Sequence, residues 1–247
     1  MLRAFWQKLF KFNWVFGLAL VLLLGIPRFI IVLNANVADN YSKIAFIFLV
    51  MWFTPLIFLT KDGRRSIGIK KPVNYHWLFY ALIAGITLCT IVYFVGIGLF
   101  GHTFNNWFVY IAKSYNTKNI LFNYQQRLAY FLIYACTAMT FSPIGEELFY
   151  RGIVHGSFAV RLGEKWASVA DGAAFALTHL AHFGIVYIFG GWQFLFLPAM
   201  LWVLFMFLSS LLFFYCKVKT GSIAGAIICH AGFNLAMIYL IFYHILK

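Results

Sequence analysis

The chain has 247 residues, of which 64% are hydrophobic and only 10% are charged. A soluble domain has about 45–50% apolar and about 25% charged residues, so this chain lacks the polar surface needed to cover its apolar mass. Soluble globular, disordered, coiled-coil and disulfide-rich secreted proteins are therefore excluded. The net charge is +13. Because the basic residues lie beside apolar segments, we interpret them as topology signals and contacts to anionic lipid, not to nucleic acid.

Seven apolar runs are long enough to cross about 30 Å of hydrocarbon. They lie at 14–33, 43–60, 76–100, 128–150, 166–183, 193–215 and 222–243. A short apolar segment at 183–191 leaves an eighth span open. The predicted fold is all-α, a polytopic bundle of about seven transmembrane helices that forms one integral membrane domain over 1–247. Long unbroken runs argue against a β-barrel.

The distribution of Lys and Arg predicts the orientation. Most of them fall on the inner side if the N-terminus is cytoplasmic, as the positive-inside rule requires. Arg28, which interrupts the first run, is assigned to the outer side. The longest polar connection, 101–127, contains several aromatic residues. We interpret them as an interfacial belt in preference to a substrate-gating loop; they are Trp107, Phe108, Tyr110 and Phe122.

Three of the six acidic residues lie within or at the edge of apolar runs: Glu146, Glu147 and Asp171. An ionisable group there is costly and faces the bundle interior or water. Glu147 and Arg151 are four residues apart, the favoured order for a pair on one helix face, while Glu146 points about 100° away. Two adjacent carboxylates repel each other when both are ionised, so one of them holds a proton more readily. A carboxylate of that kind is suited to act as a general base. An acidic patch at a cytoplasmic helix end is the alternative. For Asp171 we expect only a salt link to a nearby Arg.

The Ser-Pro-Ile-Gly segment at 142–145 predicts a break in the fourth span, with the carboxylates in the first turn of a new helix. A simple proline kink is the alternative. Depth imposes a further condition. For Glu146 to reach the layer of His179 and His230, the fourth helix must continue past Arg151, and we predict that it does.

Two histidines, His179 and His230, lie deep in apolar runs. Phe175 shares a helix face with His179, and Asn234 shares one with His230, because each pair is four residues apart. A single membrane histidine usually forms one interhelical hydrogen bond. Two histidines, an Asn and a Glu pair on three separate spans indicate a functional centre. The remaining histidines are interpreted as turn or surface residues, among them His155 in a cytoplasmic turn and His182 near the outer surface.

The three clusters, in this order, resemble the CPBP family of intramembrane proteases. That family includes the CAAX prenyl endopeptidases and the bacterial Abi proteins tied to bacteriocin immunity. Its pattern is Glu-Glu-x-x-x-Arg, Phe-x-x-x-His and His-x-x-x-Asn, and all three motifs are complete here. The resemblance places a motif-bearing catalytic core at about 126–243.

The resemblance implies a glutamic intramembrane endopeptidase without a cofactor. Glu146 with His179 would activate a water, and His230 and Asn234 would donate hydrogen bonds to the oxyanion. The other motif residues are implied to orient the site (Glu147 and Arg151) or to contact substrate (Phe175). The implied partners are the lipid bilayer, here of a bacterial cell membrane, and a peptide or lipid-anchored protein as substrate.

Three rival hypotheses stay open. Glu146, His179 and His230 could bind Zn²⁺ with an open water position. A non-catalytic membrane immunity or scaffold protein could bind a peptide without cleaving it. A transporter could use a proton-coupled Glu/His relay, although it would favour inverted repeats, which the sequence does not show.

Overall fold

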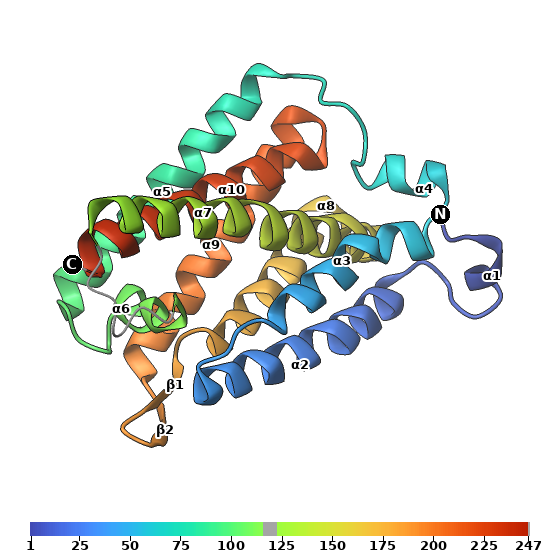
Figure 1. Cartoon of the computed structure of the whole chain (residues 1–247). Helices are drawn as coiled ribbons and strands as arrows, with labels where there is room; N and C mark the ends of the chain where they lie inside the picture. The colour runs from blue at the N-terminus through green and yellow to red at the C-terminus, as the bar shows by residue number, and fades with distance from the viewer. Residues whose placement is uncertain (116–122, 247) are drawn as a thin grey trace.

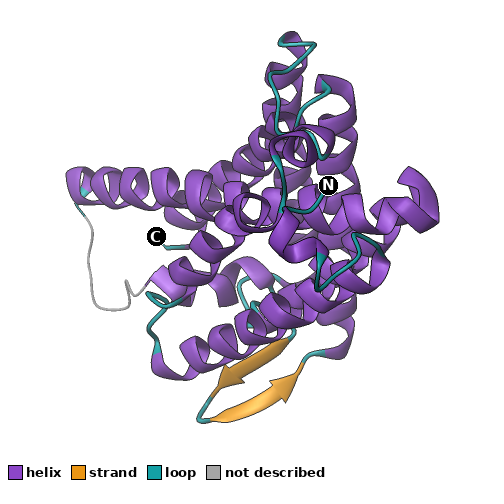
Figure 2. Cartoon of the chain, turned by 90° about the vertical axis from the view of Figure 1, so that its right-hand side faces the viewer, coloured by secondary structure: helices purple, strands orange, loops and turns teal. Residues whose placement is uncertain are grey.

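A computed structural model describes residues 1–115 and 123–246. Helices dominate it, with one small hairpin at the edge (Figure 2). In chain order the elements are α1 (Ala4–Gln7), α2 (Trp14–Ala38), α3 (Ile44–Phe58), α4 (Lys61–Ser66), α5 (His76–Phe100), α6 (Trp107–Ala112), the 3-10 turn η1 (Lys113–Tyr115), α7 (Tyr124–Glu146), the π-helix η2 (Glu147–Val154), α8 (His155–Thr178), the 3-10 turn η3 (His179–Ala181), β1 (Ile185–Ile188), β2 (Gly191–Phe194), α9 (Phe196–Thr220), α10 (Ile223–Leu240) and the π-helix η4 (Ile241–Ile245). The predicted helical fold is confirmed.

Five helical stretches in the described part of the chain are long and apolar enough to cross a membrane: Trp14–Ala38, His76–Phe100, Tyr124–Ala181, Phe196–Thr220 and Ile223–Ile245. The predicted seven runs differ from this count for two reasons. First, α3 has only 15 residues. Second, the runs 128–150 and 166–183 belong to one helical stretch, interrupted at Gly163 by non-helical angles of φ 72° and ψ 166°. Glycine adopts a positive φ without steric cost.

The eighth span considered at 183–191 is wrong. Residues 185–188 and 191–194 pair as an antiparallel hairpin, with Ile185 opposite Phe194 and Ile188 opposite Gly191. The turn between them uses positive φ at Phe189 and Gly190, and a helix cannot continue through such residues. This apolar segment is therefore a short connection that leads into α9.

The helix that carries the two carboxylates is continuous. Asn123 and Gln126 form a capping box at the start of α7, and α7, η2 and α8 then follow one another through Pro143 and past Arg151. The break predicted at 142–145 is wrong, whereas the continuation past Arg151 is confirmed. Proline removes one backbone donor, and four residues after Pro143 the chain enters the π-helix, a form frequent at functional sites.

Helix α10 packs against α5, α7 and α9, and lies alongside α5 (Figure 1). Glycines allow this approach. A Cβ atom at Gly232 would collide with the carbonyl of Leu82, and one at Gly85 would collide with the carbonyl of Cys229. Close backbone contact of this kind is how membrane helices gain packing energy, and here it fixes the helix that bears His230.

We expect Gly85→Ala to lower the free energy of unfolding by about 1–3 kcal/mol, because the added methyl group overpacks the interface between α5 and α10. Gly98→Ala is the matched control on the same helix, since nothing lies within 4 Å of a Cβ placed there. Thermal unfolding of the two variants in detergent measures the difference. Equal midpoints would contradict the close packing.

The aromatic residues of the 101–127 connection do not form an interfacial belt. Trp107, Phe108 and Tyr110 are buried, and Trp107 stacks on Trp202 of α9 at 6.0 Å between ring centroids. These rings pack into the end of the bundle because their apolar area gains more from burial than from an interfacial position. Phe122 lies outside the described residues.

Candidate active site

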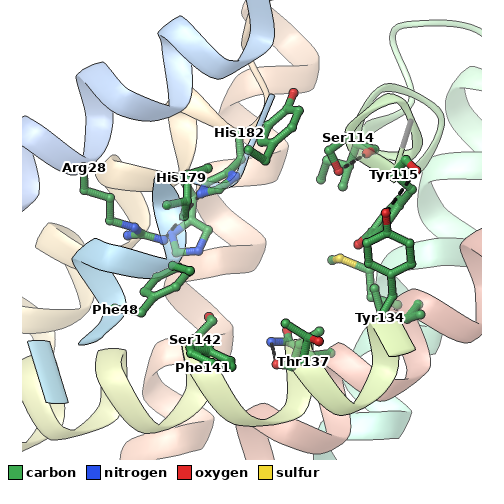
Figure 3. Close-up of a pocket in the computed structure, with 18 of the residues that line it drawn as sticks. Arg28, Phe48, Ser114, Tyr115, Tyr134, Thr137, Phe141, Ser142, His179 and His182 are labelled. Atoms are coloured by element: carbon green, nitrogen blue, oxygen red, sulfur yellow. Dashed lines mark hydrogen bonds between the residues drawn. The ribbon is translucent and has the colours of Figure 1, made fainter. Parts of the chain in front are cut away.

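A cavity of about 880 Å³ lies between the helices, and segments from both halves of the chain line it. Figure 3 shows Arg28, His179 and His182 at one side and Ser114, Tyr115 and Tyr134 at the other, with Thr137 and Ser142 of α7 between them. Four of the predicted site residues line this cavity: Phe175, His179, His230 and Asn234. Glu146 and Glu147 lie behind its wall, with no exposed side-chain surface.

Glu146 is held by three other side chains. It forms an ion pair with Arg28 of α2, its Oε2 accepts a hydrogen bond from the Ser142 hydroxyl at 2.9 Å, and the same oxygen lies 3.6 Å from His230 Nε2. Arg28 is itself 2% exposed and donates to Thr178 Oγ1 at 2.6 Å. A buried carboxylate needs such a partner to offset the cost of burying its charge, and Arg28 is that partner for Glu146.

Glu147 joins the other two motif residues. Its Oε1 lies 2.8 Å from His230 Nδ1, and its Oε2 lies 3.2 Å from Arg151 Nε, so the predicted i,i+4 pair is confirmed. The Arg151 guanidinium lies over the Phe175 ring at 4.1 Å. Because Glu147 accepts from Nδ1, the histidine turns its Nε2 toward Glu146. A carboxylate that fixes a histidine ring in this way is a common device at catalytic sites.

His179 follows the last turn of α8 and lies in the cavity (Figure 3). Its Nδ1 lies 2.8 Å from the Phe175 carbonyl, and its ring packs on that of Phe175 with centroids 4.4 Å apart. Donation from Nδ1–H leaves Nε2 as an acceptor. Trp202 donates to the His179 carbonyl at 3.1 Å, which anchors the turn. Phe175 thus supports His179 on one side and Arg151 on the other.

Asn234 lies one turn after His230 on α10, as predicted, and lines the cavity. Its Nδ2 donates to the Ala138 carbonyl of α7 at 2.9 Å. This bond ties α10 to the helix of the carboxylates. The predicted site residues therefore come together from α7, η2, α8, η3 and α10, around one polar centre.

Sequence reasoning missed Arg28, which also lies outside the predicted core of 126–243. The signal was present: a charge inside a 25-residue apolar helix is as costly as the buried carboxylates are. His182 was also given no role at the site, whereas it lines the cavity and its Nε2 lies 3.5 Å from Arg28 Nη2. Arg28 and His182 are neighbours only because the segments that carry them pack together, and the sequence does not reveal that packing.

The interpretation of His155 as a turn residue is wrong as well. His155 is 2% exposed, and its Nδ1 lies 2.7 Å from Asp171 Oδ2. Asp171 Oδ1 lies 4.0 Å from Arg151 Nε, so the salt link expected for Asp171 is present, at long range.

The donor set proposed for zinc does not fit the geometry. Among the described residues no three His, Cys, Asp or Glu side chains are arranged to hold a metal ion. Arg28 pairs with Oε1 of Glu146 and Ser142 donates to its Oε2, so both oxygens that a metal cation could bind already have partners.

Residues 128–236 match the family model described as type II CAAX prenyl endopeptidase Rce1-like. The matched segment contains all three motifs and covers a little under half of the chain. The comparisons with curated proteins and with solved structures gave no significant match. The resemblance to the CAAX protease family is thus confirmed over this segment. Together with the long apolar helices, it supports an integral membrane protein and implies a CAAX-type intramembrane endopeptidase.

Proposed function

From the Rce1-like segment and the buried cluster it contains, we propose that this protein is an intramembrane endopeptidase in which Glu146 activates a water. One observation carries the proposal. The Glu146 carboxylate is fully buried, paired with Arg28, and adjacent to His230 at the wall of a large cavity. A buried charge placed beside a histidine and a cavity is expensive for a purely structural role.

The chemistry follows from these groups. A water that enters from the cavity gives a proton to Glu146 while its oxygen bonds to the peptide carbonyl carbon. The free Nε2 of His179 accepts the water's other hydrogen and orients it. When the C–N bond breaks, Glu146 returns its proton to the leaving amine, so the carboxylate is regenerated and a water is consumed.

The oxyanion needs donors placed before the reaction begins. His230 faces Glu147 from Nδ1 and Glu146 from Nε2, so Nε2 is the nitrogen placed to donate toward the reacting carbonyl. Its Nε2–H then stabilises the oxyanion with help from the Asn234 amide. Glu147 and Arg151 orient this ring, and Phe175 forms the floor on which both His179 and Arg151 rest.

The cavity wall beside His182 and Ala181, whose carbonyl accepts a hydrogen bond from Asn36, suits a peptide. Tyr41 donates to Asn36 Oδ1 at 2.6 Å, and burial raises the pKa of Tyr41, so this hydroxyl stays protonated. Hydroxyl and amide groups there offer partners to a peptide backbone. We place the chain in a bacterial cell membrane with a cytoplasmic N-terminus, as one domain with a catalytic core at 126–243 to which Arg28 contributes. Its substrate is a membrane peptide or lipid-anchored protein.

Comparative mass spectrometry of membrane-associated and released peptides tests the proposal. Cells carrying the native protein are compared with cells carrying Glu146→Gln at equal expression. A fragment present only with the native protein would identify the cleaved bond and the substrate together. Identical peptide profiles, with the cellular effect retained in the variant, would instead favour a non-catalytic immunity or scaffold protein.

We expect cleavage to be independent of metal ions, because Arg28 and Ser142 between them engage both carboxylate oxygens of Glu146. Purified protein treated with a strong chelator should keep its full rate, and elemental analysis should find less than a stoichiometric amount of zinc. Loss of cleavage with the chelator, reversed by added Zn²⁺, would support the metalloprotease alternative.

A further inference from the structure

A second set of polar residues leads from the protein surface to the candidate active site, and none of its outer members belongs to the three motifs. Glu164 is 75% exposed, whereas His155 is 2% exposed and Asp171 has no exposed surface. His155 Nε2 lies 2.9 Å from Glu164 Oε2, and its Nδ1 lies 2.7 Å from Asp171 Oδ2. His155 begins α8, Glu164 directly follows the bend at Gly163, and Asp171 lies further along the same helix.

Asp171 connects this set to the site. Its Oδ1 lies 4.0 Å from Arg151 Nε, and the same nitrogen lies 3.2 Å from Glu147 Oε2. Glu147 in turn contacts His230 at 2.8 Å. One guanidinium nitrogen therefore faces two carboxylates, one from the site and one from the outer set.

The orientation of Arg151 depends on these two carboxylates. Both Nη atoms of Arg151 have no hydrogen-bond partner among the described residues. The guanidinium is otherwise held by stacking on Phe175 and, at 5.4 Å, on Phe213. Stacking fixes the plane of the guanidinium but does not by itself determine where its nitrogen atoms lie within that plane. Asp171 and Glu147 both attract the guanidinium at Nε, so the charge on Asp171 contributes to the position of Arg151.

The contacts of His155 support the same view. Both of its ring nitrogens face carboxylate oxygens, one of Asp171 and one of Glu164. One face of the ring is covered by Phe214, with centroids 4.5 Å apart. Lys217 supplies the remaining nearby cation, and its Nζ donates to the Arg151 carbonyl at 2.6 Å. A buried charge pair that only filled space would gain nothing over apolar residues.

We propose that His155 and Asp171 are positioning residues of the peptidase site, acting through Arg151 on Glu147 and His230. The proposal rests on the proposed function for its kinetic test, but not for its spectroscopic one. Asp171→Asn preserves the shape and the hydrogen bond from His155 and removes the charge opposite Arg151. His155→Gln with Asp171→Asn replaces the pair by a neutral hydrogen-bonded pair.

The kinetic test uses the peptide that the native protein cleaves. We expect both variants to lower kcat about 10–100-fold, as loss of a supporting partner does at other sites, with KM within about twofold because neither residue lines the cavity. Glu164→Gln should change kcat by less than about threefold, since an exposed pair is screened by solvent. Ser210→Ala is the packing control: its buried hydroxyl lies against Gly172 and has no partner among the described residues.

The spectroscopic test needs no activity. With ¹⁵N-labelled histidine in detergent micelles, the ring signals of His155 and His230 are assigned from their loss in His155→Gln and His230→Gln. We expect Asp171→Asn to shift both signals and Ser210→Ala to shift neither. An unshifted His230 signal, or a native-like kcat in Asp171→Asn, would overturn the proposal. If the native protein cleaves no peptide, the proposed function fails and the His230 signal alone decides the positioning role.

Discussion

Glu146→Gln is expected to reduce kcat about 10²–10⁴-fold, the range that general acid–base catalysis contributes, while Glu147→Gln should reduce it only about 10–100-fold. The two residues are adjacent and equally buried, so burial cannot produce the difference. Their partners can. Glu146 faces Arg28, Ser142 and the cavity wall, whereas Glu147 is committed to His230 and Arg151.

The comparison requires the purified proteins and the peptide identified by mass spectrometry. Single-turnover rates separate the chemical step from peptide release, and KM should change little in either variant because neither carboxylate lines the cavity. The unfolding midpoints serve as the control for folding. A larger loss in Glu147→Gln than in Glu146→Gln would contradict the proposed roles and identify Glu147 as the base.

Composition and hydropathy predicted the helices well where a run is both long and apolar. The runs 76–100 and 222–243 correspond to His76–Phe100 and Ile223–Leu240, because burial in lipid requires every backbone group to bond within its own segment. Apolarity alone failed at 183–191. There, glycines and a positive φ at Phe189 favour a hairpin, and hydropathy carries no information about backbone turns.

The candidate site was predictable in its motif residues but not in its partners. Spacing places Glu147 near Arg151 and Phe175 near His179, because both pairs are local to one helix. The contact between Arg28 and Glu146 joins residues far apart in the chain. Its prediction requires the packing of α2 against η2 and α8, which no periodicity encodes. The pairing of His155 with Asp171 was missed because Gly163 was not recognised as a bend.

The contact between Arg28 and Glu146 provides the sharpest test of the site as a whole. Arg28→Gln leaves the buried Glu146 carboxylate without its cation, and breaking a buried pair in this way costs about 3–5 kcal/mol. We therefore expect a large fall in the unfolding midpoint in detergent together with loss of cleavage. Arg65→Gln, which removes an exposed cation, is the matched control and should change neither.

The double variant Arg28→Gln with Glu146→Gln separates stability from catalysis. Removing both charges leaves two neutral amides in the same volume, so most of the lost stability should return. Cleavage should not return, because the base is gone. Additive destabilisation in the double variant would show that the two side chains act independently and that Arg28 does not neutralise Glu146. Recovered stability without cleavage would assign both effects to this one ion pair.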